Sequence, residues 1–534
     1  MNERATITFE PSGRTVSVPL GSTLLEAARA AGIEIDAPCG GTGTCGSCRV
    51  RATGALSAAT RSEQELLGGA GVAAGKRLAC RTRVEGDATV LMPEAPREAR
   101  VVTAAQHKVA EVQPPLERGI DRLGDLTGTA FDIGTTTIAG ELVDLRTGAV
   151  LATSGDLNAQ RAVGADVLSR VAHASSGGAA ELRAMVVSQV DAMTLGMLDQ
   201  AGRDPETLAE SVVAGNVTMT GLFLGADVSA LGEAPYEGAP VSGRHVRPEE
   251  IGSSLPGGLD IIILPAASAF VGADVTMGML ATSLADRVMP TLYLDLGTNG
   301  EIVLVARGQV FAATTAAGPA LEGASITCGM RAEAGAIEQV ALESGALRLG
   351  VIGEQEPRGI CGSGLLDLIA ALLDAGLVDA SGRMLDTVGH PLRMRVTERG
   401  GSRAFIVDER SGIVLTQQDV RQVQLAVGAI RTGIDLLLAS ARLESAAIVQ
   451  VVIAGGFGFH VRAASLVRLG LLPPAWFDRV MFAGNTALAG ARMALLSGAV
   501  RERVEGLARR VQTVDLAAHP EFQRRFLASL TFPE

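Results

Sequence analysis

The stretch "TAFDIGTTTIAGELV" (residues 129–143) decides the fold, because the chain repeats its design further on. It predicts an apolar strand that carries Asp132 near its end, a turn of glycine and threonines, and a second apolar strand. The segment "TLYLDLGTNGEIVLV" (residues 291–305) has the same order, with Asp295 in the place of Asp132. Two copies of strand, turn and strand, about 160 residues apart, indicate an internally duplicated fold.

The residue types in the two turns suit a polyphosphate ligand. Backbone N–H groups and hydroxyls of a glycine–threonine turn can face phosphate oxygens, and an aspartate beside each turn can hold the waters of a hydrated Mg²⁺. We therefore predict that Asp132 and Asp295 are catalytic. The predicted phosphate-binding residues are Gly134, Thr135, Thr136, Thr137, Gly297, Thr298, Asn299, Gly300 and Glu301. The alternative is a pair of ordinary β-hairpins with Gly–Thr turns.

A third motif lies near the end of the chain, in "IVQVVIAGGFGFH" (residues 448–460). It predicts an apolar strand that runs into a glycine-rich turn. Small residues at the carboxyl end of a strand let an adenosine group approach the backbone. Gly455, Gly456 and Phe457 are therefore predicted to contact the nucleotide.

Four of the six cysteines lie in the first 80 residues, three of them on the glycine-rich loop "CGGTGTCGSC" (residues 39–48). The spacing suits an iron–sulfur cluster: Cys45 and Cys48 can hold one iron, and the outer pair, Cys39 and Cys80, the second. Glycines fit a loop that wraps closely around bridging sulfides. A four-cysteine zinc site is the alternative, although such sites normally show two closely spaced pairs.

Length and charge restrict the class of protein. A chain of 534 residues with 47% hydrophobic and 19% charged residues predicts two to four soluble globular domains. Its net charge of -12 argues against nucleic acid or an anionic membrane as a partner. The N-terminus shows no signal peptide, and no 18-residue apolar stretch is present, so we expect a cytoplasmic protein. Six cysteines in such a chain are not a disulfide framework.

Two regions resemble known domains. About residues 1–93 resemble the [2Fe–2S] ferredoxin domain of β-grasp fold, which makes Cys39, Cys45, Cys48 and Cys80 the predicted cluster ligands. About residues 127–534 resemble the superfamily of acetate and sugar kinases, heat-shock chaperones and actin. That resemblance implies two ribonuclease-H-like lobes with Mg²⁺ and ATP in the cleft. The expected α/β multidomain chain has a ferredoxin domain (1–93), a linker (94–126), ATPase lobe I (127–290) and lobe II (291–534), whose C-terminal helix is a candidate to pack back on lobe I.

Further stretches resemble one family within this superfamily, the ATP-dependent reductive activators of corrinoid proteins. They are "NAQRAVGADVLSRV" (158–171), "VAGNVTM" (213–219), "FVGAD" (270–274), "DLGTNGEI" (295–302), "AAGPALEGASITCGMRAEAGAIE" (316–338), "GICGSGLLDLIA" (359–370) and "AGNTALAGA" (483–491). The resemblance implies reduction of the cob(II)amide of a B12-binding methyltransferase subunit to cob(I)amide. Electrons would come from an external low-potential donor, such as a ferredoxin or flavodoxin, through the cluster. A homodimer is a further expectation.

The chain also departs from that family's pattern. Members usually carry a middle domain between the ferredoxin and nucleotide domains, and we expect it to be missing, because only the linker stands there. Thr220 follows Met219, where relatives often have a histidine. Two other functions remain open: an ATP-dependent small-molecule kinase with a redox-sensing ferredoxin domain, and an ATP-switched assembly or chaperone module. The iron–sulfur loop argues against both, because neither chemistry uses a one-electron carrier.

Overall fold

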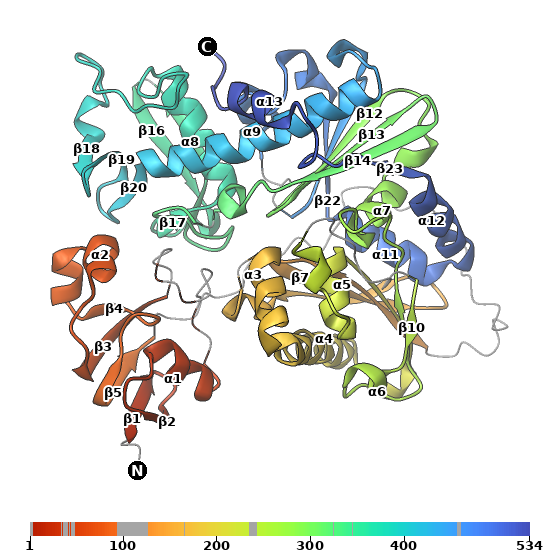
Figure 1. Ribbon diagram of the computed structural model, residues 1–534, viewed down its shortest axis with the longest axis horizontal. Helices are drawn as coiled ribbons and strands as arrows, with labels where there is room; N and C mark the ends of the chain where they lie inside the picture. The colour runs from red at the N-terminus through yellow and green to blue at the C-terminus, as the bar shows by residue number, and fades with distance from the viewer. Residues whose placement is uncertain are drawn as a thin grey trace. The chain divides into compact units, whose positions relative to one another are not determined.

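The computed structural model describes residues 4–33, 35, 41, 43, 48–92, 126–164, 166–233, 243–323, 325–343, 345–456 and 461–534 (Figure 1). Cys39, Cys45 and Phe457 lie outside the described residues, as does the expected linker apart from its last residue. The chain divides into two compact units, one of residues 1–97 and 159–178 and the other of residues 98–158 and 179–534. Each unit has its own core.

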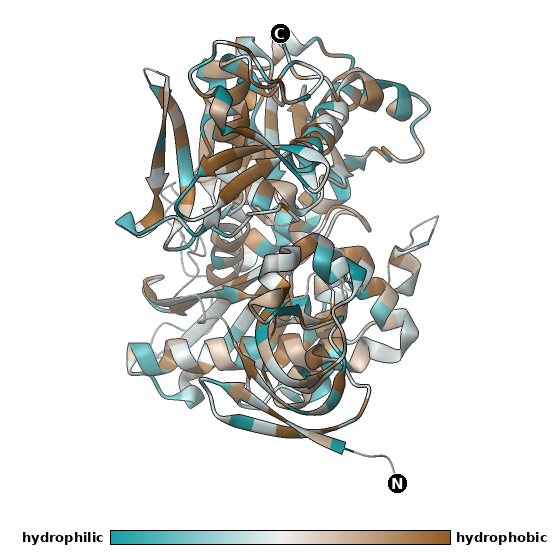
Figure 2. Cartoon of the chain, turned by 90° about the vertical axis from the view of Figure 1, so that its left-hand side faces the viewer, coloured by the Kyte–Doolittle hydropathy of each residue, from teal (hydrophilic) through white to brown (hydrophobic). Residues whose placement is uncertain are grey.

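The first unit is built on a five-stranded mixed sheet in the order β2-β1-β5-β3-β4. Its strands are β1 (Arg4–Glu10), β2 (Arg14–Pro19), β3 (Arg49–Leu56), β4 (Lys76–Leu78) and β5 (Val84–Leu91). The alternating segments "ATITF" and "TVSVP" predict an N-terminal hairpin, which is confirmed because β1 pairs antiparallel with β2. β1 also pairs parallel with β5, as a β-grasp domain requires. The strands near the N-terminus alternate between hydrophilic and hydrophobic residues (Figure 2), which turns one face toward the core.

Two capping boxes start the helices of this sheet domain. Thr23 followed by Glu26 predicts a capping box in the sequence, and the first helix, α1 (Leu24–Ala30), begins after Thr23, whose side chain accepts from the N–H of Glu26. Thr60 and Glu63 in the sequence predict a second, short helix that closes at Gly68. Helix α2 (Arg61–Ala73) begins after Thr60, and its backbone leaves the helical conformation at Gly68 (φ 70°, ψ 153°) before it continues to Ala73. The segment "LACRTRV" (residues 78–84) predicts a strand from its sequence, and this prediction is wrong: β4 ends at Leu78, and residues 79–81 form a turn. Helix α3 (Val167–His173) completes the elements of this unit.

The second unit contains two six-stranded sheets, and the first has the order β10-β11-β9-β6-β7-β8. The strands are β6 (Thr127–Ile133), β7 (Thr137–Asp144), β8 (Val150–Leu157), β9 (Leu208–Gly215), β10 (His245–Val246) and β11 (Asp260–Ile263). β6 to β8 form an antiparallel meander, and β9 pairs parallel with β6 on its other side. The carboxyl ends of β6 and β9 therefore lie side by side at one edge.

The second sheet has the order β22-β21-β12-β13-β14-β23; five of its strands, β14-β13-β12-β21-β22, repeat the order β8-β7-β6-β9-β11 of the first, which confirms the predicted duplication, while the sixth strands, β10 and β23, lie at opposite ends. The strands are β12 (Thr291–Leu296), β13 (Gly300–Ala306), β14 (Gln309–Thr315), β21 (Gln450–Ala454), β22 (Val480–Gly484) and β23 (Val511–Thr513). β12 pairs antiparallel with β13 and parallel with β21, as β6 does with β7 and β9. This is the ribonuclease-H-like strand order 3-2-1-4-5 in each lobe.

Helices and two small sheets surround these strands. The helices are α4 (Ala179–Ala201), α5 (Val217–Leu224), α6 (Pro248–Ile251), α7 (Ala273–Ala281), α8 (Gly362–Asp374), α9 (Gln417–Ser440), α10 (Ala463–Arg468), α11 (Thr486–Leu496), α12 (Gly498–Arg510) and α13 (Phe522–Ala528). The small sheets contain β15 (Ala336–Glu343), β16 (Ala346–Val351), β17 (Gly359–Ile360), β18 (Val396–Arg399), β19 (Ser402–Asp408) and β20 (Ile413–Thr416). Among the described helices α9 alone is long and apolar enough to cross a bilayer, but 72% of its most apolar window is buried, so it is a core helix.

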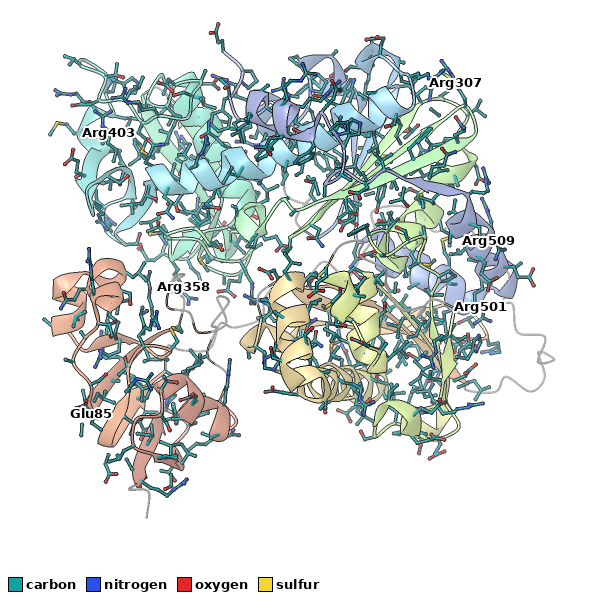
Figure 3. The ribbon with its side chains drawn as sticks, in the orientation of Figure 1. Glu85, Arg307, Arg358, Arg403, Arg501 and Arg509 are labelled. Carbon is teal, nitrogen blue, oxygen red and sulfur yellow. The ribbon has the colours of Figure 1, made fainter. Side chains whose placement is uncertain are left out.

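The two lobes share their central helices. Met277 of α7 packs in the core of the first sheet, while Val275 and Met279 of the same helix pack in the core of the second. Helix α11 follows β22 of the second sheet but packs on β6 and β9 of the first. Helix α12, which follows α11, is also held against the first sheet. Its Arg501 (Figure 3) forms an ion pair with Glu210 of β9. Relative motion of the lobes must therefore involve α7 and α11.

Candidate functional site

Two of the four predicted cluster ligands are described, and their sulfurs lie together. Cys48 precedes β3 and Cys80 lies in the turn after β4; both are buried, and their Sγ atoms are 3.3 Å apart. That separation is too long for a disulfide, at about 2.05 Å, and near the ~3.8 Å of two thiolates on one tetrahedral metal with bonds of about 2.3 Å. The positions of Cys48 and Cys80 are therefore compatible with ligands of an iron–sulfur cluster. Cys48 and Cys80 are close enough to share one iron; Cys45, with which Cys48 is expected to pair, lies outside the described residues.

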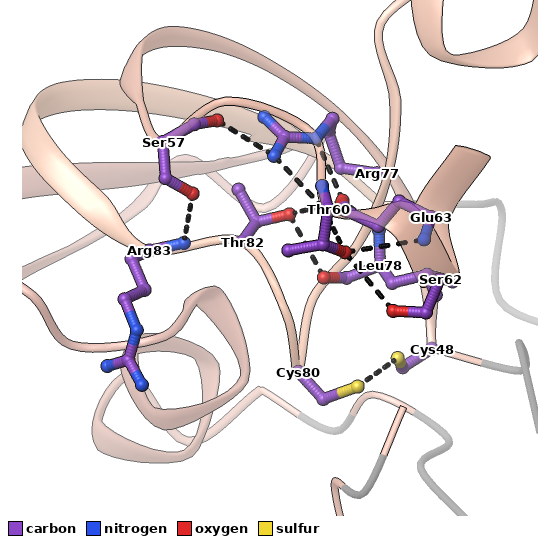
Figure 4. Close-up of polar contacts among 10 residues, drawn as sticks. All are labelled: Cys48, Ser57, Thr60, Ser62, Glu63, Arg77, Leu78, Cys80, Thr82 and Arg83. Carbon is purple, nitrogen blue, oxygen red and sulfur yellow. Dashed lines mark hydrogen bonds and ion pairs between the residues drawn. The ribbon is translucent and has the colours of Figure 1, made fainter. Parts of the chain in front are cut away.

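A buried carboxylate fixes the turn that carries Cys80 (Figure 4). Glu63 Oε1 accepts from Arg77 Nε at 2.9 Å, from Thr82 Oγ1 at 2.9 Å and from the N–H of Leu78 at 3.1 Å. Burial alone would raise the pKa of Glu63, but these donors, with Arg77 foremost, lower it to about 2. The anchored residues, 77 to 82, flank Cys80 on both sides and hold its thiolate against Cys48.

The structure brings the two predicted phosphate turns together. Each turn is closed by a backbone hydrogen bond, from Gly134 N–H to the Thr137 carbonyl at 2.9 Å and from Gly297 N–H to the Asn299 carbonyl at 3.1 Å. Between the turns, Thr136 Oγ1 and Thr298 Oγ1 are 3.1 Å apart. Residues 162 positions apart in sequence thus supply neighbouring hydroxyls, as a polyphosphate site between duplicated lobes requires.

The glycine motif of the third predicted stretch lies beside this site. Asp295 pairs in register with Ala454, so Gly455 follows directly at the carboxyl end of β21. Gly455 has a φ of +90°, and a Cβ there would stand 2.5 Å from Asp295 Oδ1. Only glycine permits this approach of backbone to carboxylate. Gly456 follows it, and no Cβ at Gly456 would meet another atom within 4 Å, which leaves room for a ligand.

The remaining predicted residues also lie at the turns. Thr135 is buried and its Oγ1 accepts from Asn216 Nδ2 at 3.0 Å. Thr137 begins β7 and Gly300 begins β13. Burial raises the pKa of Glu301, the second residue of β13, and the nearby charges of Asp274 and Asp295 raise it further.

Four carboxylates crowd between the turns: Asp132, Asp274, Asp295 and Glu301. Burial, together with the charge of Asp295, raises the pKa of Asp132 to about 7, against a partly opposing hydrogen bond from Asn485. Burial and mutual repulsion raise the pKa values of the other three above their usual range. None of the charges that act on these groups belongs to an arginine or lysine of the described residues. A cation bound beside these groups would therefore lower their pKa values.

The carboxylates fit a hydrated cation better than a directly ligated one. Within the described part of the chain, no three His, Cys, Asp or Glu side chains are grouped so that they could hold a metal ion. Mg²⁺ keeps several waters when it binds through carboxylates and phosphates. Asp132 and Asp295 could hold such waters, and the missing positive charge would come from the ion.

Sequence reasoning missed five residues of the site. Asn485, the N-cap of α11, donates to Asp132 Oδ2 at 3.0 Å, and Tyr293 Oη lies 3.3 Å from Asp295 Oδ2. Asn216 caps α5 as Asn485 caps α11. The other two are Asp274 and Glu322. A signal existed for the asparagines, since "AGN" occurs twice, each time between a strand and a helix.

Comparison with known proteins gives matches over both regions. The family model described as the 2Fe-2S iron-sulfur cluster binding domain matches residues 7–85, that of the RACo middle region residues 127–287, and that of the C-terminal domain of RACo, the ASKHA domain, residues 289–534. The middle region is therefore present and coincides with the first sheet. The expectation that a middle domain is missing is corrected by this match.

Individual relatives cover most of the chain. The corrinoid activation enzyme RamQ of Eubacterium limosum is 34% identical over 417 residues, 76% of this chain and 70% of the relative. The [Co(II) methylated amine-specific corrinoid protein] reductase of Methanosarcina barkeri is 26% identical over 439 residues, 76% of this chain and 77% of the relative. A solved reductive activator for corrinoid, iron-sulfur protein superposes with a TM-score of 0.73 at 30% identity, and covers 99% of this chain and 98% of its own.

Proposed function

The chain belongs to the RACo-type reductive activators of corrinoid proteins, and from this premise we propose how its parts divide the reaction. It is an ATP-dependent enzyme that activates a corrinoid protein by reduction of cobalt from Co(II) to Co(I). Its ferredoxin domain carries a 2Fe-2S cluster, and its ASKHA domain binds ATP. The observation that carries this function is the presence of both domains in one chain, together with a solved activator that covers 99% of that chain.

The cysteine loop is the route of the electron. A bound [2Fe–2S] cluster supplies a one-electron carrier near -400 mV, with wide variation. Cys39, Cys45, Cys48 and Cys80 would hold it, and the Glu63 network keeps Cys80 in place beside Cys48. The electron reaches this loop from an external low-potential donor of the ferredoxin or flavodoxin class, and leaves it for the cobalt of the partner.

The nucleotide site supplies the free energy that the reduction needs. If the Co(II)/Co(I) couple lies roughly 0.1–0.2 V below the cluster, electron transfer is unfavourable by about 2–5 kcal/mol. A protein that binds one state of its partner more tightly shifts that equilibrium. ATP between the lobes would set which state of the corrinoid protein the chain binds, and hydrolysis would release the product.

Asp132 and Asp295 act in this scheme as holders of hydrated Mg²⁺. The threonine hydroxyls and turn N–H groups bind the phosphates, and Gly455 and Gly456 admit the adenosine. The bound ion would neutralise the phosphate oxygens. The cation-poor carboxylate cluster supports this assignment.

The partner is a corrinoid protein, and we propose that it is the B12-binding subunit of a methyltransferase system. A homodimer, a cytoplasmic location and the absence of nucleic acid or membrane partners are proposed with it. Cys328 and Cys361 form no disulfide, in agreement with a reducing compartment.

An absorption assay tests the function. Cluster-loaded protein, reduced donor, Mg·ATP and a Co(II) corrinoid protein should give the Co(I) spectrum, and the Co(II) partner should stimulate ATP hydrolysis. The matched control replaces ATP by ADP. Equal rates of cobalt reduction with and without ATP would contradict the proposed coupling. Phosphate transfer to a small molecule would favour the kinase alternative.

A further inference from the structure

A fifth carboxylate, Glu322, lies close to Asp295 and Glu301 and joins the two phosphate turns. Glu322 Oε2 accepts a hydrogen bond from Thr136 Oγ1 at 3.0 Å and from Thr298 Oγ1 at 2.7 Å. The three oxygens form a triangle, because the two hydroxyls are themselves 3.1 Å apart. With one proton on each hydroxyl, both protons can point to the carboxylate. The threonine hydroxyls of both turns therefore donate to the same oxygen of Glu322.

The backbone around Glu322 is built to hold it there. The residue ends a short 3-10 turn, η7 (Pro319–Glu322), flanked by Gly318 and Gly323, both with a φ of +76°. A Cβ at Gly323 would meet the Met330 carbonyl oxygen at 2.5 Å, so glycine is required on that side. Leu321 is fully buried and anchors the turn in the core. The direction of the Glu322 side chain is thus fixed by its neighbours.

The other carboxylates of the site are engaged differently. Asp132 accepts from an asparagine amide, Asp295 lies against the Tyr293 hydroxyl, and Asp274 accepts from the N–H of Val275. Burial and mutual repulsion raise their pKa values, so a bound cation would stabilise their charged forms. Glu322 instead contacts the hydroxyls that are expected to bind phosphate. Among the described carboxylates, Glu322 accepts hydrogen bonds from a threonine of each turn.

We propose that Glu322 is the general base that positions and deprotonates the attacking water in ATP hydrolysis. This inference rests on the proposed function, since it assumes that ATP binds between the turns. Phosphate oxygens compete for the hydroxyls of Thr136 and Thr298. Once these hydroxyls donate to phosphate, Glu322 Oε2 no longer accepts their hydrogen bonds. It can then accept a hydrogen bond from a water molecule beside the γ-phosphate.

The step balances in atoms and electrons. The water oxygen forms a bond to the γ-phosphorus while the bond from that phosphorus to the β,γ-bridging oxygen breaks, and ADP leaves with the electron pair. One water proton passes to Glu322 Oε2 and is then given to the released inorganic phosphate. No oxidant or reductant takes part, so the base can be tested apart from electron transfer.

The decisive variant is Glu322→Gln, which keeps the size of the side chain and a carbonyl acceptor for the threonines but cannot take up a proton. We expect kcat of ATP hydrolysis to fall about 10²- to 10⁴-fold. The Kd for ATP should stay within a few-fold or tighten, because a negative charge leaves the phosphate site. The matched control is Glu343→Gln on the β15–β16 hairpin, where the side chain is 56% exposed and pairs with Arg348; it should hydrolyse ATP at the wild-type rate.

A second variant keeps the test decisive if Glu322→Gln misfolds. Glu322→Ala leaves space for a small carboxylate, so added formate should restore hydrolysis while chloride at equal ionic strength should not. Unchanged kcat in Glu322→Gln would overturn the proposal, as would loss of ATP binding in step with hydrolysis, which would make Glu322 a structural clasp. If the wild-type chain hydrolyses ATP but does not reduce cobalt, the proposed function fails while the assignment of Glu322 stands.

Discussion

One carboxylate in each unit has a strongly shifted pKa, and the two shifts have opposite directions. Glu63 in the ferredoxin-like unit is fully buried, yet Arg77 and neighbouring donors lower its pKa to about 2. Asp132 in the nucleotide site is half-buried, and burial together with the charge of Asp295 raises its pKa to about 7. The difference is the supply of donors. A carboxylate with a full set of donors stabilises the fold, whereas a group of carboxylates without a cation is kept for a ligand that brings one.

The two kinds of carboxylate also differ in how their loss affects the stability of the fold. Removal of Glu63 leaves Arg77 buried without its partner, which destabilises a fold. Removal of one member of the aspartate group relieves repulsion and therefore does not destabilise the fold. Function and stability should therefore respond to different variants.

The largest expected effect comes from Asp132→Ala and Asp295→Ala. Each variant removes a holder of the hydrated Mg²⁺, whose stabilisation of phosphoryl transfer is worth several kcal/mol. ATP hydrolysis should fall by at least about 10³-fold, which corresponds to about 4 kcal/mol. Steady-state phosphate release at saturating Mg·ATP measures this.

The control for these variants is the ferredoxin-like unit. Its cluster absorption and reducibility should be unchanged, and the melting temperature of the nucleotide-binding unit should stay the same or rise. Wild-type hydrolysis by both variants would show that the two turns do not hold the ion.

The second effect is a pH dependence of the ferredoxin-like unit alone. The folded pKa of Glu63, about 2, lies below its ordinary value of 4.5, so its stabilisation is present above pH 4.5 and is lost as the pH falls toward 2. Between pH 5 and pH 3 the loss amounts to about 2 kcal/mol by that linkage relation. Hydrogen exchange of β3–β5 amides at the two pH values measures it in the full chain. Glu63→Gln should remove this part of the pH dependence, and an equal slope in both proteins would refute the role of Glu63.

Local signals in the sequence predicted much of this fold. Thr23 with Glu26 forms the capping box that starts α1, because both partners lie within one helical turn. The duplicated strand–turn–strand motif predicted two equivalent sheets, and their strand orders agree. Such features are predictable since they depend on neighbours in the chain.

Contacts between distant segments could not be predicted in the same way. Asn485 meets Asp132 across 353 positions, and Glu322 meets Thr136 across 186. No spacing rule identifies such partners, because the packing of the lobes brings them together. The same reason explains the failed strand around Cys80: hydrogen bonds to Glu63 hold residues 78–82 in a turn, against the alternation in their sequence.

The smallest effect separates the two asparagine caps. Asn485→Ser keeps a side chain that can cap α11 but removes the amide donor to Asp132 Oδ2. That donor lowers the pKa of Asp132, so its loss should raise the pKa further and reduce the ionised fraction at neutral pH. A hydrogen bond to a charged group contributes about 1.5 kcal/mol or more, which predicts roughly tenfold slower ATP hydrolysis at pH 7.

Because only ionisation is altered, hydrolysis by Asn485→Ser should recover above pH 8, and the acid limb of its rate profile should move to higher pH. The matched variant is Asn216→Ser, which removes the equivalent amide from a neutral acceptor, Thr135 Oγ1. It should slow hydrolysis without moving the acid limb, since no carboxylate loses a donor. A pH–rate profile of both variants decides the point: equal shifts in both would mean that the amide of Asn485 acts on the helix cap and not on Asp132.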